Sequence, residues 1–169
     1  MDPVDVLLGM AEISIAMVGF TGIVGALRLT GDAWSTGTLL SFWIMVELSL
    51  ACVALSLVPV ALLAFDLTPR TTWLIGSGVM IGFIALHMGI VGRRVLAEVR
   101  DGNRSPWLPR VIGPLFLATL ATLVASVTGI IATAFGPYLV ALLLLFGIAA
   151  VSFVALLASF IAAQRAENG

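Results

Sequence analysis

Three ionisable side chains lie deep inside long apolar stretches of the sequence: Glu12, Glu47 and His87. A charge near the centre of a bilayer costs about 2.5 to 3.5 kcal/mol on insertion scales, so such residues rarely face lipid and generally mark a pathway, a pair or a site. Rings of carboxylates attract cations, and a histidine can relay protons. We therefore expect these three residues to lie along an ion pathway.

The positions of these residues along their stretches predict their depths in a membrane. Counted from the midpoints at about 1.5 Å per residue, Glu12 lies roughly 7 Å toward the outside, and Glu47 and His87 lie roughly 7 Å toward the cytoplasm. Glu47 and His87 could therefore touch. The alternative for each acid is a structural hydrogen bond to a neighbouring Ser, Thr or backbone group, and for His87 a neutral ring bonded inside the bundle.

The composition excludes a water-soluble fold. Of the 169 residues, 61% are hydrophobic and 10% are charged, and the mean hydropathy is +1.19. Soluble domains carry about 25% charged residues. Each of five apolar stretches reaches the roughly 20 residues that a helix needs to cross a bilayer. We predict one all-α, polytopic transmembrane domain over residues 1–169, with Gly136-Pro137 forming a tight hairpin between the last two spans. The expected spans are 6–27, 38–65, 73–92, 111–134 and 138–163.

The arginines predict the orientation, because positive side chains near helix ends are retained in the cytoplasm. All eight basic residues are arginines, and with five spans seven of them fall on the side of the carboxyl terminus, leaving only Arg70 opposite. We therefore expect the amino terminus outside and the carboxyl terminus in the cytoplasm, in a bacterial inner (plasma) membrane. The third connection is the richest in arginine, which suggests contacts with lipid head groups; the alternative is plain topology signalling. Its arginines are Arg93, Arg94, Arg100, Arg104 and Arg110.

Small residues recur at helical spacing in the first and third spans. Such stripes let membrane helices approach closely, so we expect helix packing there. Glu12 shares the stripe of the first span, which predicts that it points into protein or water. The residues concerned are Gly9, Ala16, Gly19, Gly78, Gly82 and Gly89.

Several kinds of chemistry are excluded or unsupported. The absence of lysine excludes a retinal Schiff base, a catalytic lysine and a P-loop lysine. The single cysteine, Cys52, excludes an intrachain disulfide, and the lone histidine lacks companions for a metal site. Ser77 and His87 lie about 15 Å apart along one helix, too far for a nucleophile and its base. We expect no enzyme activity, no cofactor and no nucleic-acid partner.

Transport remains the leading hypothesis. A bundle of this size is too small to enclose a wide pore alone, so we expect a homo-oligomer in the lipid bilayer that passes an inorganic cation or proton along its carboxylates. The alternative is a non-conducting scaffold or partner subunit that docks another membrane protein through its small-residue faces.

Overall fold

The protein is a bundle of long helices. The computed structural model describes residues 2–28, 36–102, 107–131 and 134–167, and within these ranges it contains helices and no strand. The elements are α1 (Pro3–Arg28), α2 (Thr36–Ala64), α3 (Pro69–His87), the π-helix η1 (Met88–Gly92), α4 (Arg93–Arg100), α5 (Trp107–Val127) and α6 (Phe135–Glu167). Five helical segments of this part of the chain are long and apolar enough to cross a membrane, which confirms the prediction of an all-α membrane protein.

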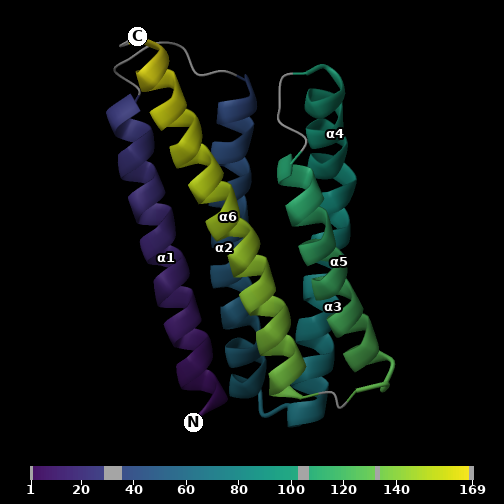
Figure 1. Ribbon diagram of the computed structural model, residues 1–169. Helices are drawn as coiled ribbons and strands as arrows, with labels where there is room; N and C mark the ends of the chain where they lie inside the picture. The colour runs from purple at the N-terminus through teal and green to yellow at the C-terminus, as the bar shows by residue number, and fades with distance from the viewer. Residues whose placement is uncertain (1, 29–35, 103–106, 132–133, 168–169) are drawn as a thin grey trace.

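Helices α2 and α6 form the middle of the bundle. Helix α1 packs mainly on α2, while α5 packs on α6 and α3 packs on α2 and α5. Figure 1 shows that successive long segments run in alternating directions, so that the two termini lie at opposite ends of the molecule. The core is apolar and is centred on α6, whose buried side chains meet those of α2, α3 and α5. Its fully buried members include Leu48, Met80, Leu123, Leu142 and Leu145.

The third span is longer than the sequence indicated. It runs without a break from Pro69 to Arg100 through α3, η1 and α4, whereas the expected span ended at Gly92. Its start follows local rules: the Thr68 hydroxyl oxygen accepts a hydrogen bond from the Thr71 N–H at 3.4 Å, and Pro69 occupies the first helical turn, where its missing N–H costs nothing. Arg93, Arg94 and Arg100 therefore lie on a helix instead of in a loop.

The connection between α5 and α6 differs from the predicted two-residue hairpin. Helix α5 ends at Val127, short of the expected Ala134, and α6 already begins at Phe135. The prediction that Gly136-Pro137 forms the turn is therefore wrong. Gly129, with φ of +80°, adopts the left-handed conformation that commonly ends a helix. Pro137 lies in the first turn of α6, where a proline is tolerated.

Helix α2 continues through Pro59, because a partner on another helix compensates for the proline. Proline has no N–H to donate, so the carbonyl of Leu55, four residues earlier, loses its partner within the helix. The hydroxyl of Tyr138, at the start of α6, donates to that carbonyl at 2.6 Å. This bond fastens the beginning of α6 to the middle of the bundle.

Candidate functional site

Glu47 and His87 meet between two spans. The Nδ1 atom of His87, the last residue of α3, lies 3.0 Å from Oε1 of Glu47 on α2. The expected contact between these residues, which lie forty positions apart in the sequence, is therefore confirmed. Because a carboxylate can only accept, the arrangement favours the tautomer in which Nδ1–H donates to Glu47.

Two aromatic rings fix the orientation of the imidazole. Phe83, one turn earlier on α3, and Phe116 on α5 both contact the ring of His87, with ring centroids 5.8 and 5.4 Å away and tilts of 32° and 31°. The side chain of His87 is 4% exposed, whereas that of Glu47 is 43% exposed. The pair thus has a buried basic member and an acidic member that reaches the surface of the bundle.

Glu12 lies apart from this pair. It is exposed on α1. The depth of Glu12 follows from a contact between α1 and α2: the Thr21 hydroxyl lies 3.6 Å from the sulfur of Met45. Since the two helices are antiparallel, Glu12 is level with about Ala54, which puts it about 10 Å from Glu47 along the bundle. The two carboxylates therefore occupy different depths, as the sequence predicts.

Two buried hydroxyl groups lie at depths between the carboxylates. The Oγ atoms of Ser14 on α1 and Ser49 on α2 are enclosed, and neither has a hydrogen-bond partner among the described residues. A hydroxyl group can donate one hydrogen bond and accept others, so it can take part in a chain of proton transfers. The composition of the spans alone did not single these two serines out from the other small polar residues.

The predicted small-residue stripes point away from the bundle. A Cβ atom added at Gly9, Gly19, Gly78, Gly82 or Gly89 would meet nothing within 4 Å. Ala16 is exposed on the same face as Gly19. Any close packing at these positions is therefore with a molecule outside this chain.

The close approaches within the chain occur at other glycines. A Cβ at Gly25 would lie 3.0 Å from the ring of Phe42, and one at Gly76 would lie 3.2 Å from the ring of Tyr138 and 3.4 Å from Pro59. Neither glycine was among those expected to pack against other helices. The signal that could have indicated Gly76 is the proline inside the preceding span. It leaves the carbonyl of Leu55 in need of a donor from a neighbouring helix, and the ring of that donor, Tyr138, lies against Gly76.

The arginines of the third connection gather at one end of the molecule. Arg93, Arg94, Arg100 and Arg110 are exposed on α4 and at the start of α5, which lie at the end opposite to the amino terminus (Figure 1). Arg104 lies outside the described residues.

The described residues form no group of three His, Cys, Asp or Glu side chains that could hold a metal ion, and Cys52 is buried in the core. Comparison with known proteins finds no matching family model, no matching curated protein and no matching solved structure.

Proposed function

We propose that this chain is an integral membrane channel or transporter of a bacterial inner membrane, and that it passes protons or another small cation as a homo-oligomer. The observation that carries the proposal is the 3.0 Å contact between His87 and Glu47, two titratable groups held together between membrane-spanning helices. Ionisable residues at such depth mark ion and proton routes more often than they serve stability alone. The pairing of an imidazole with a carboxylate favours the proton as cargo.

The exposure of both acids supports an oligomer. Glu12 and Glu47 reach the surface of the isolated bundle, where lipid would surround them in a monomer. Burying either charge in hydrocarbon costs about 2.5 to 3.5 kcal/mol, so water or a neighbouring protein surface must cover them. Symmetric association of several copies would turn these carboxylates toward shared, hydrated space.

A proton route through the chain would combine these groups. His87 can exchange a proton with Glu47 through Nδ1, and the exposed side of Glu47 can exchange it with water. The hydroxyl groups of Ser14 and Ser49 offer transfer groups at intermediate depth, and Glu12 serves as the carboxylate station of the other half of the membrane. Replacing either acid by its amide removes the titrating group while keeping nearly the same shape.

The first prediction tests this route by proton flux in liposomes. Glu47→Gln and Glu12→Gln should each lower the flux driven by a pH gradient at least tenfold, because an amide cannot exchange the proton. Asp66→Asn is the matched control, since this exposed carboxylate lies between α2 and α3, outside the spans, and its flux should equal that of the wild type. Equal flux in all variants would remove both carboxylates from the mechanism, and a wild-type protein that passes no cation under any gradient would refute the function.

The second candidate is a non-conducting partner subunit. The outward-facing glycines of α1 and α3 favour it, because they offer two faces on which another membrane helix could pack closely. Purification in mild detergent separates the candidates. A defined homo-oligomer supports the channel or transporter, whereas a single copy that co-purifies with a different polypeptide in fixed ratio supports the subunit.

A further inference from the structure

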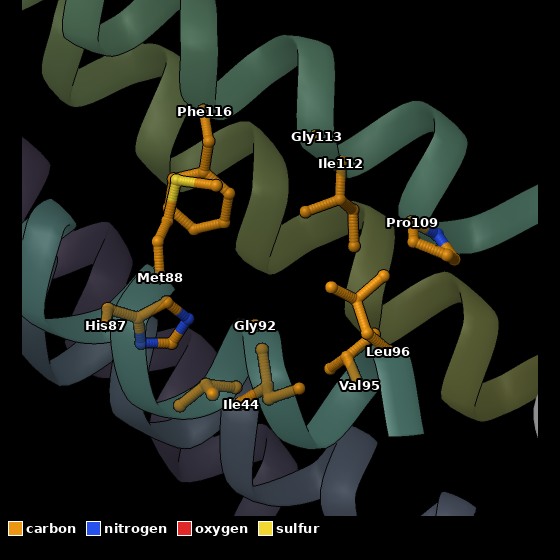
Figure 2. Close-up of a pocket in the computed structure, with 11 residues that line it drawn as sticks. Ile44, His87, Met88, Gly92, Val95, Leu96, Pro109, Ile112, Gly113 and Phe116 are labelled. Carbon is orange, nitrogen blue, oxygen red and sulfur yellow. The ribbon is translucent and has the colours of Figure 1, made fainter. Parts of the chain in front are cut away.

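A cavity of about 190 Å³ lies beside His87, and Glu47 is not among the residues that line it. Its walls come from α2, from the continuous helix that contains η1, and from the start of α5, and it is partly open to the outside of the bundle (Figure 2). Engineered apolar cavities of about 150 Å³ bind benzene, so this space suits one substituted ring. Its volume therefore limits the occupant to a small molecule or to part of a larger one.

The wall of this cavity is apolar except at one side chain. His87 is the polar member, and the other lining residues are aliphatic, aromatic, glycine, proline or methionine. Figure 2 shows the imidazole ring projecting between Met88 and Gly92, with the ring nitrogen farther from its backbone facing the open space. That atom is Nε2, because Nδ1 is engaged by Glu47.

The hydrogen bond to Glu47 determines what Nε2 can do. When Nδ1 of the neutral ring carries the proton, Nε2 holds a lone pair and acts as an acceptor. Leaving a buried acceptor without a donor costs about 1 to 3 kcal/mol of free energy. A molecule that fills this cavity is therefore stabilised if it brings one hydroxyl group to that atom.

The π-helix shapes the cavity. Along the continuous helix of α3, η1 and α4, three pairs of residues line it, at positions 87–88, 91–92 and 95–96, a repeat of four. An α-helix has about 3.6 residues per turn, so a repeat of four would drift around its axis. The wider turn of the π-helix takes more residues and keeps the three pairs on one face; single π-helical turns occur frequently at functional sites.

We propose that this cavity binds one small, uncharged ring compound that carries a hydroxyl group, and that the hydroxyl group donates to Nε2 of His87. Phe116, which already flanks the imidazole, would pack against the ring of the ligand. The site depends on the Glu47–His87 hydrogen bond but not on ion transport, so it goes beyond the proposed function.

Two probes of equal shape test the site in the full chain, reconstituted in lipid nanodiscs with ¹³C-methyl methionine. The first is 4-ethylphenol, and the second is 4-ethyltoluene, in which a methyl group replaces the hydroxyl. The Met88→Leu variant identifies the signal of Met88. This signal should shift saturably as 4-ethylphenol is added. At equal bilayer concentrations, the affinity for 4-ethyltoluene should be at least tenfold lower. No saturable shift, or equal affinity for both probes, would overturn the proposal.

Three variants sharpen the test. Gly113→Leu places a side chain where an added Cβ meets nothing and should fill the cavity, while Gly78→Leu adds the same side chain on an open surface and should bind the probe as the wild type does. His87→Asn keeps an amide nitrogen near the position of Nδ1 but removes Nε2, so the two probes should bind it equally. If Gly113→Leu still binds 4-ethylphenol, or His87→Asn still prefers it, the proposed site is wrong. Loss of proton flux with unchanged probe binding would concern the transport proposal alone.

Discussion

At the scale of single residues, the contact between Glu47 and His87 joins two spans through one part-buried hydrogen bond, in which the imidazole is the buried partner. A buried donor that loses its only acceptor costs about 1 to 3 kcal/mol, because nothing replaces the lost partner. An exposed side chain without a partner carries no such cost. The two intramembrane acids should therefore differ in what they contribute to stability, whatever they contribute to transport.

This difference gives a stability prediction. Glu47→Leu should lower the free energy of unfolding by about 1 to 3 kcal/mol, because Nδ1 of His87 is left unpaired. Glu47→Gln keeps an acceptor oxygen, so its free energy of unfolding should fall by less. Glu12→Leu is the control and should unfold like the wild type, since Glu12 is exposed without a partner among the described residues. Titration with a denaturing detergent measures the free energy of unfolding of the three variants. If Glu47→Leu unfolds with the same free energy as the wild type, the contact does not stabilise the fold.

At the scale of elements, the proline in α2 and the tyrosine of α6 depend on each other. Pro59 frees the carbonyl of Leu55, and the hydroxyl of Tyr138 satisfies it at 2.6 Å. The ring of Tyr138 also contacts Trp73 at a centroid distance of 5.7 Å, so three spans meet at this point. The start of α6 thus supplies the donor that Pro59 denies to α2.

A double-mutant cycle tests this dependence. Tyr138→Phe should destabilise the fold by about 1 to 3 kcal/mol, because the Leu55 carbonyl becomes a buried acceptor without a donor. In a Pro59→Ala background the N–H of residue 59 can donate to that carbonyl. The same Tyr138→Phe change should then lower the free energy of unfolding by clearly less. Unfolding in mixed detergent micelles gives the four free energies. Purely additive effects would mean that the tyrosine and the proline are independent.

At the scale of the whole molecule, the distribution of arginine predicts how the bundle sits in the membrane. The exposed arginines of α4 and α5 lie at the end opposite to the amino terminus, and Arg70 lies at the other end (Figure 1). Positive side chains are retained in the cytoplasm during insertion. The end that carries α4 should therefore be cytoplasmic.

Cysteine labelling in intact cells tests this orientation. Thr71→Cys lies at the end expected outside and should react with a membrane-impermeant maleimide, whereas Asp101→Cys should react only after the cells are opened. Both positions are exposed. The wild-type chain is a suitable background because its Cys52 is buried and should not react. The reverse labelling pattern would contradict the orientation.

Features that depend on local physics follow from the order of the amino acids alone. Long apolar runs required five membrane-spanning helices, and the constant rise of a helix set Glu47 and His87 at the same depth. Tertiary structure decided which faces meet. The spans are apolar on nearly every side, so periodicity does not distinguish the core face from the outer face, and only the fit of neighbouring side chains does. That fit turned Gly9, Gly19, Gly78, Gly82 and Gly89 outward, brought Tyr138 to Leu55, and placed the second nitrogen of His87 against an apolar cavity.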